Sequence, residues 1–441
     1  MINRYFQLKE KQTSIRIEAI AGLTTFLTMA YIIFVNPAIL SDAGMDKNAL
    51  IAVTCIISAA ATIAVGVFAK APIAMAPGMG LNAFFTYSLV LGDKINWETA
   101  LGIVFLSGLF FLLLTVLGLR RKIVEAIPPA LISAISVGIG LFITFIGLVN
   151  LGVIVDNQAT LVSAGRLTPT VLIGLAGLLV MLFLEIKRIR GALLIGIIFA
   201  TVLAELFGYT EKPTQLVSLH LDISAVVLNL DILGALKWSL LGPIFTLMFM
   251  DMFDSVGTLM ACCRQADMVD EKNKVRGLDR LLVIDAAATM AGAVLGTSTT
   301  TAYVESAAGI EQGGRSGLAS IITGVLFLVA MLFAPVVGIV PQFATAPALI
   351  MVGLFMVKEV NKIDFTDLQE AFPAFIIMVM IALSYSISTG LAFGFISFTL
   401  TKTVAGRAKD IRLAMWIIAV LSVVFLTLDW LPRIILWISG G

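Results

Sequence analysis

The chain has 441 residues, of which 59% are hydrophobic and only 13% are charged, and its mean hydropathy is +1.04. Soluble globular proteins contain about 45–50% apolar and about 25% charged residues, so this composition excludes a water-soluble enzyme and a disordered chain. A net charge of +1, without a basic patch interleaved with aromatic residues, gives no sign of nucleic-acid binding. The class that remains is an all-α polytopic membrane protein.

Apolar stretches bounded by charged residues or by Gly and Pro follow one another along the chain. They cover 17–40, 48–69, 77–91, 97–118, 128–149, 168–187, 190–208, 236–263, 278–296, 303–314, 316–338, 345–358, 370–387 and 389–404, with a last one at 412–437. A helix needs about 20 residues to cross a bilayer, and the stretches after Pro77 and before Glu311 are too short for this. We predict fourteen spans, with 412–437 either a fifteenth span or an interfacial helix.

The distribution of positive charge predicts the orientation. The basic residues at 120–122 and those between Arg264 and Arg280 fall on the same side as the N-terminus when the fourteen spans alternate. This excess of Lys and Arg indicates the cytosolic side, so we expect a multi-pass protein of the cytoplasmic membrane with a cytosolic N-terminus. Of the 29 Lys and Arg residues, those left outside are Lys47, Lys94, Arg166, Lys212, Lys237 and Arg433.

The two halves of the chain resemble each other at an offset of roughly 200–220 residues. Stretch 17–40 corresponds to 236–263, and the short stretch after Pro77 corresponds to the one that ends near Gly309. Seven spans per half is an odd number, so the second half must be inverted in the membrane. Inverted repeats with interrupted helices in matching positions indicate a secondary transporter with a site near the bilayer midplane.

Each short stretch begins with residues that disfavour a helix. Gly and Pro crowd 71–80, and the β-branched run at 297–301 favours an extended backbone. We predict a short extended segment in each place, followed by a half-helix from Leu81 and from Tyr303. If the extended segments pair with each other, two half-helix N-termini direct their N–H groups to one place. Such a place suits an electron-rich polar ligand.

Four carboxyl groups lie deep in the apolar stretches, where their cost makes a functional role the first expectation. Asp251 and Asp254 are three residues apart and are expected to share one helix face. Glu305 falls in the first turn of the second half-helix and is expected to face the same cavity. For Asp285, a structural role as a polar anchor competes with a role in the site.

Polar and aromatic residues of the first half-helix complete the candidate site. Asn82 holds the place that corresponds to Glu305, and its amide can both donate to and accept from the edge of a heteroaromatic ring. The phenylalanines that a ring could stack on, each also a candidate for ordinary packing, are Phe26, Phe84, Phe85 and Phe253.

The few His and Cys residues exclude several chemistries. His220 is the only histidine and falls in an outer loop, so carboxyl groups must carry any protons that drive transport. Cys55, Cys262 and Cys263 lie in or beside apolar stretches and suggest neither a disulfide framework nor a zinc site. We expect no metal and no cofactor.

Four strings make the chain similar to a known family. They are TTFLTMAYIIFVNPAIL at 24–40, APGMGLNAFFTY at 76–87, FMDMFDSVGTL at 249–259 and GTSTTTAYVESAAGI at 296–310. The chain resembles the nucleobase–cation symporters of the nucleobase/ascorbate superfamily, and within it the AzgA-like permeases for hypoxanthine, guanine and adenine. The Asp-Ser-Val-Gly and Tyr-Val-Glu-Ser-Ala-Ala-Gly strings are specific to this purine branch, since the xanthine/uracil branch would show Glu at the place of Asp254.

The resemblance implies the uracil-permease fold, with fourteen helices in two inverted repeats of seven. It implies a core domain from 1–126 and 236–343, which hold spans one to four and eight to eleven. It also implies a gate domain from 127–235 and 344–410, followed by the C-terminal segment 411–441. The family contains dimers that form through the gate.

The resemblance also assigns residues. The expected substrate site comprises Asn82, Asp251, Asp254, Glu305, Phe84, Thr300 and Thr301, and the expected proton-coupling residues are Glu305, Asp251 and Asp254. Which aspartate touches the purine stays open, with a preference for Asp251. The implied activity is import of purine nucleobases by proton symport, in which the core moves against the gate.

Three alternatives compete with this hypothesis. The same fold could carry uracil, xanthine or an inorganic anion, although an anion site would use cations rather than carboxylates. A channel would not give saturable, gradient-driven accumulation. An intramembrane aspartyl protease would bring its two aspartates together from two helices, whereas Asp251 and Asp254 lie on one. The preference among the three purines and the oligomeric state are not predicted.

Overall fold

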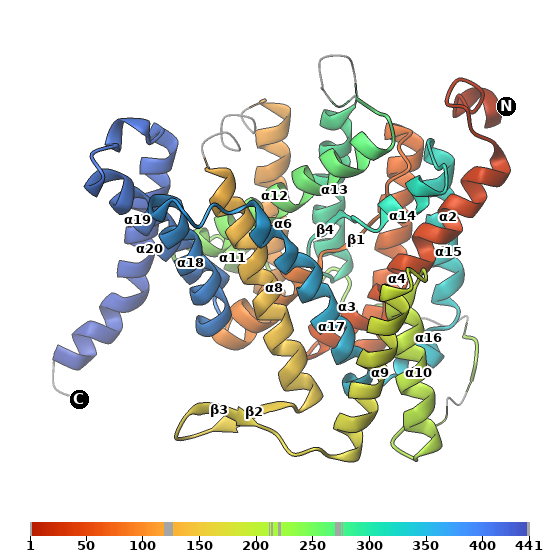
Figure 1. Ribbon diagram of the computed structural model, residues 1–441, viewed down its shortest axis with the longest axis horizontal. Helices are drawn as coiled ribbons and strands as arrows, with labels where there is room; N and C mark the ends of the chain where they lie inside the picture. The colour runs from red at the N-terminus through yellow and green to blue at the C-terminus, as the bar shows by residue number, and fades with distance from the viewer. Residues whose placement is uncertain are drawn as a thin grey trace.

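The computed structural model describes residues 2–118, 127–210, 212, 215–218, 222–269, 275 and 277–438. The basic residues at 120–122 and His220 lie outside the described residues, as do the side chains of 428–438. The described chain is helical almost throughout, with two small two-stranded sheets (Figure 1). A helical, multi-span membrane protein is therefore confirmed. One of the two sheets joins the predicted extended segments, and the other was not predicted.

The elements of the first half follow the predicted apolar stretches closely. They are α1 Ile2–Tyr5, α2 Ile15–Met29, α3 Ile32–Ser41, α4 Lys47–Ala64, the π-helix η1 Val65–Ala69, β1 Met75–Pro77, α5 Met79–Ala83, the π-helix η2 Phe84–Gly92, α6 Trp97–Val116, α8 Pro129–Leu151, β2 Ile154–Asn157, β3 Leu161–Ala164, α9 Pro169–Ile186 and α10 Ala192–Leu206.

The second half contains the corresponding series. It comprises α11 Ile232–Ala235, η3 Trp238–Leu240, α12 Leu241–Gln265, α13 Leu278–Leu295, β4 Thr300–Ala302, α14 Ser306–Glu311, α15 Gly317–Met331, α16 Ala334–Gly338, α17 Gln342–Val357, η4 Lys358–Lys362, α18 Leu368–Ser384, α19 Ile387–Val404, η5 Ala408–Asp410 and α20 Leu413–Ile438. The last predicted stretch is thus one helix, which packs against α19.

Eight helical segments of the described chain are long and apolar enough to cross a membrane. Shorter apolar helices account for further predicted stretches, among them Met79–Gly92, Gly317–Met331 and Leu368–Ser384. The first predicted stretch is divided into α2 and α3, and Tyr31 lies at the break between them. This break places a polar ring in the middle of an otherwise apolar span.

The two predicted extended segments form an antiparallel pair. Met75 lies opposite Ala302 and Pro77 lies opposite Thr300, and both strands are completely buried. The pairing is confirmed, but the half-helices begin at Met79 and Ser306, two residues before and three residues after the predicted starts. Irregular backbone at membrane depth must find partners inside the protein. The two strands bond to each other, and the hydroxyls of Thr62 and Thr289 bond to the backbone of Met75 and Thr300.

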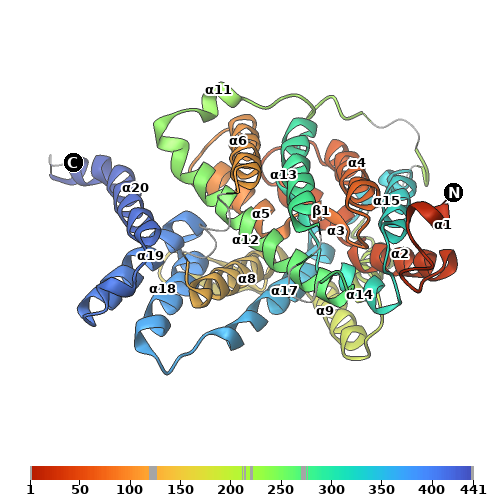
Figure 2. The ribbon, with the colours of Figure 1, turned by 90° about the horizontal axis from the view of Figure 1, so that it is seen from above.

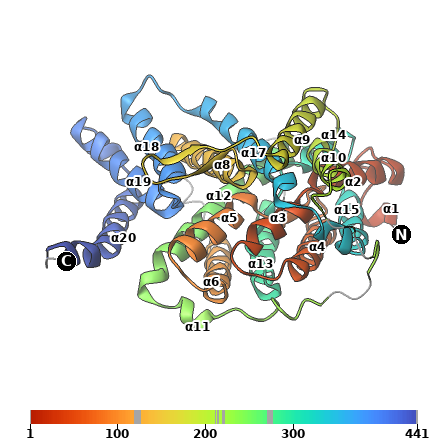
Figure 3. The same ribbon diagram turned by 90° about the horizontal axis from the view of Figure 1, so that it is seen from below.

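The helices pack in two groups, and the strand pair lies within the first of them. One group contains α2, α3, α4 and α6 together with α12, α13, α14 and α15, and the other contains α8, α9 and α10 together with α17, α18 and α19. Figure 2 shows β1 among the helices of the first group, and Figure 3 shows α8 and α17 side by side in the second. Gly66 and Gly317 let η1 and α15 touch, since a Cβ on Gly317 would lie 2.0 Å from the Gly66 carbonyl oxygen.

A β-hairpin that the sequence analysis did not predict joins α8 to α9. Strands β2 and β3 pair antiparallel, with Ile154 opposite Ala164 (Figure 1). The turn is built by Asn157, whose Oδ1 accepts hydrogen bonds from the N–H groups of Ala159 and Thr160. A side chain that bonds to the backbone in this way stabilises a tight turn.

Candidate functional site

The β1–β4 pair holds the two half-helices with their N-termini together. Gly78 N–H donates to the carbonyl of Thr299, and Tyr303 N–H donates to the carbonyl of Ala74, each at 3.0 Å. The Tyr303 hydroxyl also donates to the carbonyl of Pro77. The positive ends of α5 and α14 therefore meet at one place inside the bundle.

Glu305 stands at the N-terminus of α14 in a fixed orientation. Its Oε1 accepts a hydrogen bond of 2.6 Å from the hydroxyl of Tyr31, which is buried at the break between α2 and α3. Hydrogen bonds to a carboxylate are among the strong ones in proteins. Glu305 itself is only half-buried, so part of its carboxyl group remains available to a ligand.

Asp251 and Asp254 both lie on α12, but in different surroundings. Asp251 is completely buried and accepts a hydrogen bond of 2.9 Å from the Thr289 hydroxyl. Asp254 is exposed, lies 3.5 Å from the Thr301 hydroxyl and interacts electrostatically with Glu305. Residues three apart point in directions about 60° apart on a helix, and the boundary between buried and exposed surface passes between these two.

The exposed side of α12 continues from Asp254 to the end of the helix. Gly257, Ala261 and Arg264 are exposed as well, and a Cβ on Gly257 would meet nothing within 4 Å. A face with charged residues at bilayer depth is costly against lipid. The side of α12 from Asp254 to Arg264 is therefore a surface that the rest of the described chain leaves uncovered.

A second buried carboxyl group lies behind β4. Asp285, Thr289 and Gly292 lie on one face of α13, and Gly292 allows β4 to approach, since a Cβ there would be 2.9 Å from the Thr300 hydroxyl. Asp285 is completely buried, and its neighbours are Asp251, the Ser255 side chain and the backbone of Ala302. Two buried carboxyl groups side by side are costly when both are charged.

Asn82 is bonded within the protein. Its amide nitrogen donates to the Asn36 side-chain oxygen at 2.6 Å, and its amide oxygen accepts from the Ser298 hydroxyl. Asn36 donates in turn to the hydroxyls of Thr54 at 2.8 Å and Thr297 at 3.2 Å. All five side chains are buried, so Asn82 connects the first half-helix to α3, α4 and the segment before β4.

The four predicted phenylalanines all pack within the protein. Phe84 and Phe85 are completely buried in the core, and Phe26 packs edge-to-face on Phe327 at 5.2 Å. Phe253, next to Asp254 on α12, is half-buried and packs against the hydrophobic core.

Of the two predicted threonines, Thr300 is buried, and Thr301 shares a hydrogen bond of 2.8 Å with Ser255. Sequence reasoning missed Tyr31 and Asn36. Both are polar residues within the apolar string 24–40, and that contrast is the signal that could have identified them.

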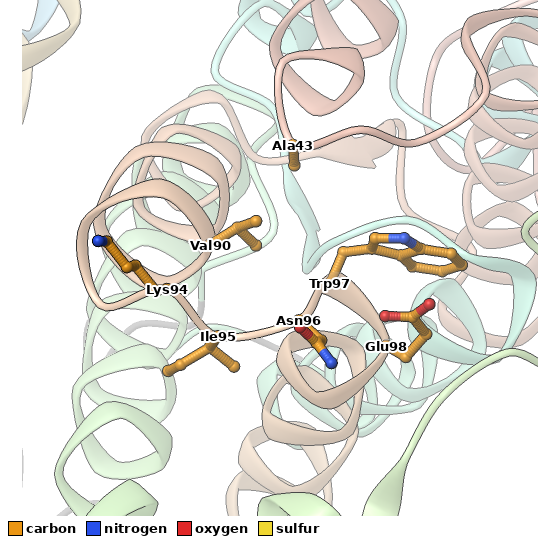
Figure 4. Close-up of a pocket in the computed structure, with 7 residues that line it drawn as sticks. All are labelled: Ala43, Val90, Lys94, Ile95, Asn96, Trp97 and Glu98. Carbon is orange, nitrogen blue, oxygen red and sulfur yellow. The ribbon is translucent and has the colours of Figure 1, made fainter.

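A cavity of about 460 Å³ lies elsewhere, at the end of η2 and the start of α6 (Figure 4). Its lining residues are Ala43, Val90, Lys94, Ile95, Asn96, Trp97 and Glu98, and none of these is a predicted site residue. The acidic residues and the half-helix N-termini therefore remain the candidate site.

Comparison with known sequences identifies relatives along nearly the whole chain. The profile of the Permease family (Xan_ur_permease) matches residues 16–428. A putative permease of Methanocaldococcus jannaschii is 46% identical over 425 residues, which are 96% of this chain and 97% of that protein. Adenine permease AdeP of Escherichia coli K12 is 41% identical, with 96% and 95% covered. Guanine/hypoxanthine permease PbuG of Bacillus subtilis 168 is 43% identical, with 96% and 98% covered.

Solved structures with a similar fold are membrane transporters. The transmembrane domain of the cyanobacterial bicarbonate transporter BicA superposes with a TM-score of 0.64 at 18% identity, covering 85% of this chain and 96% of that one. The inward-facing murine anion transporter Slc26a9 superposes with a TM-score of 0.63 at 11% identity, covering 89% and 69%. At these identities the likeness concerns the fold alone.

Proposed function

Because the chain belongs to the Permease family, we propose that it imports purine nucleobases by proton symport. Permeases are transporters and not enzymes, so the alternative of an intramembrane protease is wrong. The chain is a multi-pass membrane protein, and the resemblance to nucleobase permeases is confirmed. Relatives at 41% and 43% identity over nearly their whole length are named adenine and guanine/hypoxanthine permeases, which supports the purine class of substrate.

We place the purine between Glu305 and Asp254. These two carboxyl groups come from different helices, interact with each other electrostatically and are both reached from outside the core. A purine edge carries ring N–H groups and ring acceptors, which a charged and a protonated carboxyl group can pair with respectively. Because Asp254 is exposed and Asp251 is buried, this placement favours Asp254 over Asp251 as the residue that contacts the substrate.

Proton coupling falls to the same carboxyl groups and to Asp251 behind them. Glu305 and Asp254 can accept a purine N–H when charged and donate to a ring acceptor when protonated, so proton binding and substrate binding must influence each other. Asp251 and Asp285 are both completely buried, and as two carboxyl groups they repel each other when both are charged. A proton on either one relieves their repulsion, which makes the pair sensitive to proton supply.

The transport movement that we propose is a displacement of the core against the gate. The two helix groups of the fold support this division into 1–126 with 236–343 and 127–235 with 344–410, although α17 already begins at Gln342. The antiparallel pairing of β1 with β4 supports two inverted repeats of seven spans. With a cytosolic N-terminus, the exposed face of α12 would lead to the cytosol. Segment 411–441 would stand outside both repeats.

Uptake into liposomes tests the function. Purified protein is reconstituted, and accumulation of labelled hypoxanthine, guanine and adenine is measured with and without an inward proton gradient, with unlabelled uracil and xanthine as competitors. We expect gradient-driven accumulation of a purine that uracil does not inhibit. Uptake of uracil alone would overturn the purine assignment, and uptake of xanthine alone would overturn the assignment to hypoxanthine, guanine and adenine. Purine uptake that ignores the proton gradient would overturn the symport.

Variants of single carboxyl groups test the site. We expect Glu305→Gln to abolish proton-driven accumulation, and Asp254→Asn to weaken competition by unlabelled purine about 10- to 100-fold, because a hydrogen bond to a charged group contributes ~1.5–3 kcal/mol. Glu311→Gln is the matched control, since Glu311 is exposed at the other end of α14. If Asp251→Asn weakens competition and Asp254→Asn does not, Asp251 contacts the substrate and the assignment to Asp254 is wrong.

A further inference from the structure

A cluster of hydrogen bonds connects the two helix groups at the end of the molecule opposite to Arg264. Asp42 follows α3, and its Oδ2 accepts a hydrogen bond of 2.6 Å from the hydroxyl of Tyr87 on η2. Gln342, the first residue of α17, donates from Nε2 to both oxygens of Asp42 at 3.2 Å. The Asn150 amide, at the end of α8, lies 3.5 Å from the Tyr87 hydroxyl. Asp42 and Tyr87 thus belong to one group, and Gln342 and Asn150 to the other.

A second layer of contacts lies beside this cluster. Ser88 on η2 donates from its hydroxyl to the carbonyl of Tyr385, the residue after α18, at 2.8 Å. The ring of Phe142 on α8 packs edge-to-face on Tyr87 at 6.5 Å and on Tyr385 at 5.5 Å. The contacts between the groups are therefore both polar and aromatic at this end.

The opposite end of the same interface differs. There the α12 face from Asp254 to Arg264 is exposed, whereas here side chains of both groups are bonded to each other. Figure 1 shows the end of α8 at the lower side of the molecule and the N-terminus at the upper side. The two helix groups are thus hydrogen-bonded to each other at one end, whereas the α12 surface beyond Asp254 is exposed at the other.

The carboxyl group of Asp42 at this end is partly removed from water. Asp42 is half-buried, and this burial raises its pKa, while the hydrogen bonds from Tyr87 and Gln342 lower it. Those two donors replace the water that Asp42 loses, and Gln342 can do so only while the groups are together. The charged residues on the neighbouring elements are Asp46 and Lys47 at the start of α4 and Asp93 and Lys94 after η2.

The two charged residues of α4 have other partners. Asp46 caps α4 by accepting from the Ala49 N–H at 2.7 Å. Lys47 donates to the carbonyls of Gly338 and Val340 at 3.1 and 3.0 Å. The hydrogen bonds of Asp46 and Lys47 are therefore made to groups other than Asp42.

We propose that Asp42, Tyr87 and Gln342 form a latch that keeps the outer side of the transporter closed, and that this latch must break each time the site opens outward. The proposal rests on the alternating movement of core and gate proposed above, and on the cytosolic N-terminus that makes this end the outer one. It assigns to Asp42 a role in gating, at a distance from the substrate.

Exchanging the Asp42 carboxylate and the Gln342 amide between the two positions tests the latch. Gln342→Glu places a second carboxylate against Asp42, and because like charges at this distance repel, we expect the ratio of outward-open to closed molecules to rise about tenfold or more at neutral pH. The double variant Asp42→Asn with Gln342→Glu puts the amide on α3 and the carboxylate on α17. It should restore the closed state, because donor and acceptor face each other again.

The readout is the distance between spin labels at Leu91 on η2 and Val149 on α8, both exposed, after replacement of the three buried cysteines. Gln342 is exposed, so Gln342→Glu is not expected to impair folding. Tyr87→Phe, which keeps the ring and removes the donor, provides a second variant that should open the outer side. Asp46→Asn is the matched control, because Asn also caps a helix and Asp46 bonds within α4.

Label distances that do not change in Gln342→Glu and in Tyr87→Phe would overturn the latch. So would a double variant that stays as open as Gln342→Glu alone, or a control that opens equally. The distances are measured without substrate, so this test is independent of which molecule is carried. Failure of purine uptake would reject the proposed substrate and leave the distance measurement interpretable.

Discussion

Replacement of Asn82 by Ala distinguishes a residue that holds the half-helices from one that only binds substrate. In the structure the Asn82 amide bonds to Asn36 and to Ser298, and all three side chains are completely buried. The substitution removes both hydrogen bonds at once. It leaves the Asn36 oxygen and the Ser298 hydroxyl without these partners inside the bundle.

The size of the effect follows from those two groups. A buried polar group that loses its partner costs about 1–3 kcal/mol, so we expect Asn82→Ala to lower the free energy of unfolding by about 2–6 kcal/mol. Adding Ser298→Ala removes one of the two unpaired groups. The double variant should therefore recover about 1–3 kcal/mol relative to Asn82→Ala, a coupling that two independent sites would not show.

Unfolding in mixed micelles of dodecyl sulfate and a mild detergent measures these free energies, with purine competition on the same samples. The reasoning would be refuted if Asn82→Ala lost less than about 1 kcal/mol, or if the double variant were as destabilised as the two single losses added together. Weakened competition at unchanged stability would instead assign the Asn82 amide to the ligand. Both results together would mean that the amide serves the fold and the site.

Two further substitutions test how the core is assembled. Glu18 on α2 is completely buried and accepts hydrogen bonds of 2.9 to 3.3 Å from the N–H groups of Arg315, Ser316 and Ala319. Glu18→Ala should lower the free energy of unfolding by at least about 2 kcal/mol, because these N–H groups at the start of α15 lose their acceptor. Glu18→Gln should lower it by less in the same unfolding assay. Gly292→Val should abolish purine uptake, because its side chain would displace the segment around β4, which lies 2.9 Å from the position of a Cβ; uptake at the wild-type rate would show that β4 tolerates displacement.

The paired extended segments could be predicted because their cause is local. Pro77 lacks an N–H group, and the threonines at 297–301 are β-branched, so both segments resist a helix where an apolar span requires one. Inside a bilayer an unpaired strand is too costly to persist. The two segments therefore had to meet, and they pair antiparallel with Met75 opposite Ala302.

The separation of Asp251 from Asp254 could not be predicted from spacing. Three residues along a helix place two side chains on neighbouring rows, and packing decides which row is buried. Here α13 and β4 cover Asp251 through Thr289, while the surface next to Asp254 stays open. The partner of Glu305 was equally hidden, because Tyr31 is more than 270 residues away along the chain. Such contacts depend on the tertiary arrangement of α2 and α14.

The pairing of β1 with β4 has a consequence for how the protein is made. The partners Met75 and Ala302 are roughly 225 residues apart, and at a synthesis rate of about 5–20 residues per second the second strand follows the first by roughly 10 to 45 seconds. During that interval the nascent first half must keep its unpaired strand away from lipid, within the insertion machinery or near the aqueous boundary. Biogenesis of this transporter is therefore a delayed joining of two halves, and a chain released after the first half is expected to be a target for membrane proteolysis.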